Sequence, residues 1–167
     1  MFTVDVTIDN VIDALKAFIQ PYCGASVIVR AQTNRVAMPP NPCVILTELR
    51  HEDLALPIIV YDHVSAKTVQ QSSKLTIQID FYGASAGDYC KAVTMAFRSQ
   101  EAFDAFGVSV KPLYCGDGMQ SPLITGEQQY ESRWTIEAYL QYNPILQISQ
   151  QYADVLTPVI ETPVDIL

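Results

Sequence analysis

The stretch "GEQQYESRWTIEAYLQYNP", residues 126–144, contains the only tryptophan of the chain and sets the frame for the fold. Its apolar and polar residues alternate, which is the period of a long strand with one buried face, and Gly126 and Pro144 bound it. The residues expected to point inward are Trp134, Ile136, Ala138, Leu140 and Tyr142. The residues expected to point outward are Arg133, Thr135, Glu137, Tyr139 and Gln141. That outward face could meet a partner surface, a nucleic acid or only solvent.

The rest of the chain predicts two amphipathic helices and several further strands. Apolar residues fall at helical spacing near residues 8–20, after a cap at Thr7 or Asp9, and again near 85–99, after Ser85. Strand patterns cover residues 26–32, 43–49 and 74–83, and residues 110–126 are expected to form a short strand and a long turn region. Pro57 lacks a ladder donor, so the stretch around it predicts an edge strand or an extended arm. We expect an α+β fold with an about five-stranded, mostly antiparallel sheet and two helices packed on one face.

The length of 167 residues suggests one domain with a single core. We assign residues 1–145 to one α+β domain and expect residues 146–167 to form an extended C-terminal arm. The apolar residues of that arm fit no single helix, and Pro158 and Pro163 would limit its pairing with a neighbouring sheet edge.

The composition of the chain already excludes some classes of protein. Hydrophobic residues make up 49% of the chain and charged residues 17%, as in globular proteins, and no apolar run is long enough to span a bilayer. The first ten residues hold two acids and no base, unlike a signal peptide, so we expect a soluble, unexported protein. The net charge of −8 repels phosphate backbones, which disfavours a nucleic-acid processing factor.

No set of residues marks a catalytic or metal site. Cys23, Cys43, Cys90 and Cys115 lack the close spacing of metal ligands, so we expect buried, reduced thiols with no metal, no disulfide and no cofactor. His51, Glu52 and Asp53 are consecutive, and neighbours on a strand point to opposite faces, which argues against a shared site. The glycine-rich segments 82–87 and 115–118 are expected to be a helix start and a turn. A small-molecule-binding α+β module and a Cys/His-dependent enzyme remain as alternatives.

Several polar-aromatic stretches resemble the phage neck or tail-terminator proteins, which are often described as neck terminator domain proteins. The resemblance rests on "NRV" followed by prolines (34–42), on "DFYG" before a helix (80–83), and on "GEQQYESRW" with "LQYNP" (126–144). It runs in the same order from about residue 27 to 145. None of these motifs is a catalytic signature.

The resemblance implies a non-enzymatic structural protein of a long-tailed phage or prophage virion, assembled in the host cytoplasm. Such terminators look like small α/β subunits in a ring, usually of six, that caps the tail tube and joins it to the head-completion proteins. Double-stranded DNA would pass through the lumen without sequence-specific binding, and we expect that lumen to carry more acids than bases. No cofactor and no membrane are implied. The candidate interface residues are Arg35, Tyr82, Tyr130, Arg133, Tyr139 and Gln141.

Overall fold

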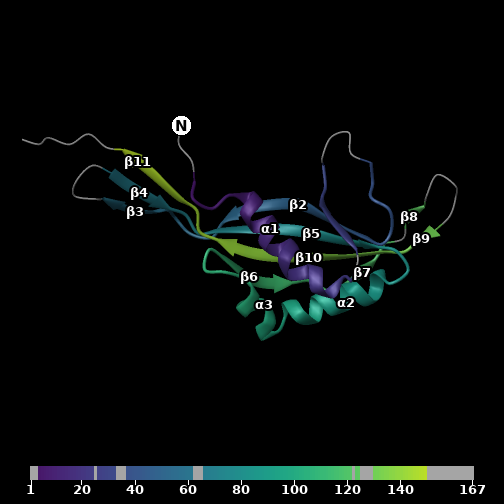
Figure 1. Cartoon of the computed structure of the whole chain (residues 1–167). Helices are drawn as coiled ribbons and strands as arrows, with labels where there is room; N and C mark the ends of the chain where they lie inside the picture. Colours follow the sequence, from purple (N-terminus) through teal and green to yellow (C-terminus); the bar gives the residue numbers. More distant parts are fainter. Residues whose placement is uncertain are drawn as a thin grey trace, which may run out of the picture.

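The computed structural model describes residues 4–24, 26–32, 37–61, 66–121, 123–124 and 130–149. The fold class is α+β, as predicted, and within these residues a six-stranded main sheet has the order β1-β2-β5-β10-β6, with β7 also paired to β10 (Figure 1). Its strands are β1 (Val27–Arg30), β2 (Cys43–Asp53), β5 (Ser73–Tyr82), β6 (Val110–Cys115), β7 (Met119–Gln120) and β10 (Arg133–Tyr142). All of these pairings are antiparallel except that of β1 with β2.

Strand β10 lies next to the central strand β5, which confirms the position predicted for it. The two strands pair along their whole length, from Arg133 opposite Tyr82 to Tyr142 opposite Ser73. The predicted inward residues of β10 are buried except Trp134, which is half-buried against the core. The inward residues of β5 are all buried, as predicted: Leu75, Ile77, Ile79 and Phe81.

Helices cover the inward face. The helix α1 (Ile8–Ile19) begins at Thr7, whose side chain and that of Asn10 form a capping box. The helix α2 (Ala86–Phe97) follows Ser85, which occupies the cap position without a side-chain capping bond. Gly83, at φ +110°, ends β5 before this helix, so the segment 82–87 is the predicted helix start.

A third helix was not predicted as a separate element. The short helix α3 (Gln100–Ala105) starts where the Ser99 side chain accepts a hydrogen bond from the Glu101 amide. It leads to Phe106, whose ring lies 5.2 Å from that of Phe18 on α1. Phe18 also contacts Phe97 of α2 at 5.7 Å. These aromatic contacts join the three helices into one layer over the sheet.

A second, three-stranded sheet extends the main sheet beyond the helices. Its strands are β3 (Ile58–Tyr61), β4 (Ala66–Gln70) and β11 (Ile145–Ser149), in the order β11-β4-β3. In Figure 1 these strands project to one side of the molecule, where no helix lies over them. The strand β3 is an edge strand, as predicted from Pro57. We refer to β3, β4 and β11 as the arm sheet.

The remaining elements are short. A 3-10 turn (Gln20–Tyr22) ends α1, and β8 (Leu123–Ile124) pairs with β9 (Tyr130–Glu131). Residues 146–149 of the predicted C-terminal arm belong to β11 in the chain's own arm sheet, and residues 150–167 lie outside the described residues. In the described part of the chain, no helix is long and apolar enough to cross a membrane.

Candidate interaction surface

The outward face of the main sheet carries the polar residues that alternate with the core. An ion pair lies at one end of it, around Asp80, which is only 3% exposed. Arg133 approaches Asp80 Oδ1 with Nη2 at 3.0 Å and with Nε at 3.1 Å. Thr135 donates its hydroxyl to the same oxygen at 2.6 Å, and Gln78 donates its amide to Oδ2 at 2.7 Å. The buried carboxylate is therefore fully hydrogen-bonded, as a buried charge must be.

This cluster holds two of the predicted interface residues in fixed positions. Arg133 lies directly opposite Tyr82 in the strand register, and its guanidinium carbon is 5.8 Å from the Tyr82 ring centre. Tyr82 is 7% exposed, and burial raises the pKa of its hydroxyl. Both side chains are thus held in place by contacts within the subunit.

A second cluster lies about six residues further along β10, which is on the order of 20 Å away at strand spacing. The Tyr139 ring is 5.8 Å from the Tyr114 ring of β6, and the Lys74 ammonium is 5.7 Å from the Tyr139 ring centre. The Tyr139 hydroxyl donates to Glu137 at 2.6 Å, which raises the pKa of that hydroxyl. Tyr114 is 56% exposed. We refer to Tyr139, Tyr114 and Lys74 as the tyrosine patch.

Charged side chains surround the tyrosine patch. Lys74 pairs with Glu52 at 2.7 Å and lowers the pKa of that carboxyl through the hydrogen bond. Arg98, from the end of α2, lies 5.8 Å from the Tyr114 ring and pairs with Asp117 at 2.8 Å. Exposed aromatic rings bordered by charged groups of both signs are typical of protein interfaces rather than of merely solvated strands.

The other predicted interface residues are dispersed. Gln141 is half-buried on β10 and donates to the Asn143 side chain at 3.3 Å. Tyr130 is 79% exposed on β9, outside the main sheet. Arg35 lies outside the described residues. The structure therefore brings Arg133 together with Tyr82, and places Tyr139 and Gln141 on the same face at the other end.

Sequence reasoning missed Tyr114 and Lys74. The alternation around Tyr114 is broken by Pro112, and the pairing of β6 with β10 shifts between Tyr139 and Leu140. Such a bulge changes which residues share a face, and its position is not visible in one strand's sequence alone. Lys74 could have been found, because it falls in the outward phase of the clearest predicted strand.

The cysteine thiols are buried, and the side chains of His51 and Glu52 lie on opposite faces of the sheet. Burial raises the pKa of Cys23 to about 12 and that of Cys115 to about 11, so both remain neutral thiols at physiological pH. All four cysteines are buried, as predicted. His51 Nε2 lies 2.8 Å from the Tyr142 hydroxyl on the helix side, whereas Glu52 pairs with Lys74 on the outward face. Among the described residues, no three His, Cys, Asp or Glu side chains gather as metal ligands.

A solved structure with a similar fold is the sheath/tube terminator of the extracellular contractile injection system PVC, determined by cryo-electron microscopy in the extended state. The TM-score is 0.51 at 13% sequence identity, which is a likeness of fold alone. The match covers 97% of this chain but 66% of that one, so this chain spans less than two thirds of that protein's length.

No curated protein sequence matches the chain. The sequence profile of phage neck terminator proteins, however, matches residues 9–166. This match covers almost the whole chain, including the segments "NRV", "DFYG" and "LQYNP" that carried the resemblance. The chain belongs to the phage neck terminator protein family.

Proposed function

We propose that this protein is a structural component of a phage virion that ends the growing tail tube in the neck and joins the finished tail to the head. Family membership over residues 9–166 is the observation that carries the proposal. The fold likeness to a sheath/tube terminator supports a tail-end position. The role needs no cofactor and no catalytic residue, which fits the buried thiols and the paired charges of the outward face.

The subunits assemble into a ring, with six as the expected number. A closed ring matches the symmetry of a tube end and leaves a lumen for double-stranded DNA, which passes without sequence-specific contacts. With 18 acids against 10 bases, each subunit can present an acidic wall that keeps the duplex from adhering. The repulsion acts over ~8 Å at physiological salt, so it keeps the DNA off the wall without blocking transit.

The tyrosine patch is the contact surface for a tail or head-completion protein. Its rings are large and held in place by Lys74 and Arg98, so little conformational entropy is lost when a partner covers them. Arg133, which is held by the Asp80 ion pair and lies beside Tyr82, is a second candidate contact at the other end of the same face. Tyr130 and Arg35 remain candidate contacts at the periphery.

Removal of the gene from the phage tests the proposed function. Without a terminator, polymerisation of the tube has no stop, so electron microscopy should show tails of uneven, increased length and heads without tails. A plasmid copy of the wild-type gene should restore tails of normal length. Normal, head-joined tails in the absence of the protein would exclude the proposal.

The tyrosine patch is tested in the same complementation assay. The double variant Tyr114→Ala, Tyr139→Ala should lower phage yield at least tenfold while the purified subunit keeps its fold. Met95→Ala is the matched control, because Met95 is an exposed apolar residue (62%) on α2, the helix layer opposite to the patch. Full complementation by the double variant would move the partner surface elsewhere.

A further inference from the structure

The arm sheet exposes apolar side chains that the subunit itself does not cover. All four residues of β3 are exposed, among them Ile58 at 60% and Tyr61 at 58%. Leu54 and Leu56, in the connection before β3, are exposed as well. Neighbours along a strand point to opposite faces, so the exposed side chains of β3 are divided between the two faces of the arm sheet.

The strand register shows how these side chains are arranged. Ile59, Val69 and Leu146 lie side by side across the three strands. The next row on the same face is Tyr61, Lys67 and Ile148. Because residues directly opposite each other share a face, one side of the arm sheet is almost wholly apolar.

The edges of the arm sheet differ. Beside β11, Val4 forms an isolated bridge with Leu146, and the Asp5 amide donates to the Ile145 carbonyl at 3.2 Å. The outer edge of β3 pairs with no other strand in the described part of the chain. An apolar strand with an open edge is a template for another strand and a liability when it stays uncovered.

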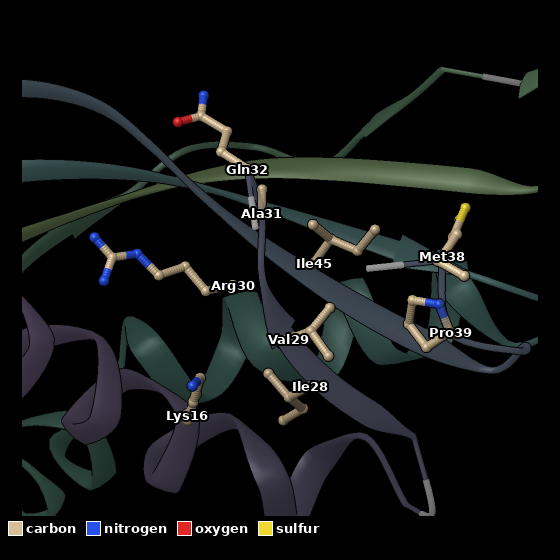
Figure 2. Close-up of a pocket in the computed structure, with 10 residues that line it drawn as sticks. Lys16, Ile28, Val29, Arg30, Ala31, Gln32, Met38, Pro39 and Ile45 are labelled. Carbon is tan, nitrogen blue, oxygen red and sulfur yellow. The ribbon is translucent and has the colours of Figure 1, made fainter. Parts of the chain in front are cut away.

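A second open edge lies on the main sheet, at β1. Among the described residues, β1 pairs only with β2, so its outer edge is free of strand pairing. A groove of about 590 Å³ runs along it, with Val29 and Ile45 on one side and Met38 and Pro39 on the other (Figure 2). Met38 in the lining and Val27 at the start of β1 are each 48% exposed. This second edge is therefore apolar too.

We propose that β3 of one subunit adds to β1 of a second copy of this chain, with its apolar side chains in the groove. The two free edges match in length, because β3 (Ile58–Tyr61) and β1 (Val27–Arg30) have four residues each. Strand addition supplies main-chain hydrogen bonds and lets alternate side chains fill pockets. Both edges lose their exposed backbone groups in a single contact.

Charge supports a second copy as the occupant. The only charged residue in the three arm strands is Lys67. The groove-lining Arg30 pairs with Asp9 and Glu48, and Lys16 pairs with Asp13. These carboxylates lie beside the groove and balance the two bases of its lining, so the single cation of the arm is not repelled there.

The geometry of this contact predicts a ring or a filament. The two surfaces are different parts of one chain, so the contact is heterologous and each subunit both donates and accepts a strand. This inference rests on the proposed ring and specifies how neighbouring subunits join within it. The tail-end role itself does not depend on it.

Two variants test the contact, one altering only the donated strand β3 and the other altering only the groove at β1. The arm variant Ile59→Lys, Tyr61→Lys alters β3 alone, and the groove variant Val29→Lys, Met38→Lys alters the groove alone. Val108→Lys is the matched control, since Val108 is the most exposed large apolar residue of the described part of the chain, at 94%, and lies outside both surfaces. Sedimentation velocity should show rings for wild type and control and a monomer for each variant by itself.

An equimolar mixture of the two variants gives the sharpest outcome. One intact groove then meets one intact arm, so the mixture should form dimers and no rings. Rings formed by either variant alone would overturn the proposal while leaving the tail-end role standing. If truncation at residue 149 abolishes assembly and the arm variant does not, the C-terminal segment occupies the groove and the proposal fails.

Cross-linking covers the case of a wild-type protein that is monomeric in solution. Subunits carrying Ile59→Cys are mixed with subunits carrying Met38→Cys and treated with a short bis-maleimide. The buried native thiols react slowly, so a cross-linked dimer should appear in the mixture, joined through the two new cysteines, and should contain one subunit of each kind. Absence of that mixed species at high concentration, with both new thiols shown to be reactive, also overturns the proposal.

Discussion

The main sheet and the arm sheet are built from the same run of chain but are stabilised differently. Strand β10 leads into β11, and β4 leads into β5, with two residues between the strands in each case. In the main sheet one face is buried under helices and the other carries ion pairs. In the arm sheet every residue of β3 is exposed and β4 is at most half-buried. A strand pattern in the sequence therefore predicts the position of a strand, but it does not predict whether another element packs on that strand.

The largest expected difference between the two sheets is in the free energy of unfolding that is lost when an isoleucine is replaced by alanine. Ile79 is fully buried in β5, so Ile79→Ala should lower the free energy of unfolding by ~2–5 kcal/mol. Ile58 is 60% exposed in β3, and Ile58→Ala should change it by no more than about 0.5 kcal/mol. Urea denaturation followed by Trp134 fluorescence measures both. Similar losses would mean that the arm sheet has a core of its own.

The next effect concerns the Asp80 ion pair of the outward face. Asp80→Ala removes the acceptor of Arg133, Thr135 and Gln78 and should cost ~2–4 kcal/mol of unfolding free energy. The control Asp117→Ala breaks an ion pair at the surface and should leave the urea midpoint unchanged. Adding Arg133→Met to Asp80→Ala should recover part of the loss, because no unpaired charge remains. A control loss equal to that of Asp80→Ala would contradict this account.

The sequence predicted the main sheet well, for a physical reason. Burial on one face enforces alternation, so Leu75 to Phe81 and Ile136 to Tyr142 could be assigned before the structure was known. The outward face was predicted only in part, because its clusters depend on cross-strand partners. Tyr114 reaches Tyr139 across a bulge, and no single-strand pattern encodes that register.

The arm sheet was the least predictable part. Its strands β3, β4 and β11 come from three separate segments, and no helix packs on them to impose a period. The residues 58–61 are uniformly apolar, so their pattern does not identify an inner face. The edge strand β3 and residues 145–149 share a sheet only because each pairs with β4, which a single-strand pattern does not encode.

A smaller effect is expected at the joint between the two sheets. The Gln71 side chain donates to the Ala55 carbonyl at 2.6 Å. The backbone N–H of Gln71 donates to the Pro144 carbonyl at 3.1 Å. Gln71→Ala keeps the backbone bond to Pro144 and removes the side-chain bonds to the Ala55 and Ser72 carbonyls, at a cost of ~1 kcal/mol. Because only the joint changes, hydrogen exchange should increase in β3 and β4 and stay constant in β5 and β10. Equal increases in all four strands would show that the two sheets open as one unit.

The smallest effect is a pH dependence that the main sheet should have and the arm strands should lack. Lys74 holds the pKa of Glu52 below its ordinary value of 4.5, chiefly through a hydrogen bond, so the folded state favours the ionised carboxylate. A group with a lowered folded pKa stabilises the protein above the unfolded pKa and loses that contribution as pH falls through the folded value. The loss from this pair should therefore begin near pH 4.5 and grow below it. Glu52→Gln should lower stability at pH 8, where the carboxylate contributes fully, and have less effect as pH falls, which reduces the acid slope. The described arm strands contain no carboxylate, so Lys67→Gln should leave the acid slope of the urea midpoint unchanged. A slope that responds to Lys67→Gln as strongly as to Glu52→Gln would mean that the charge of the arm is coupled to the acids of the body.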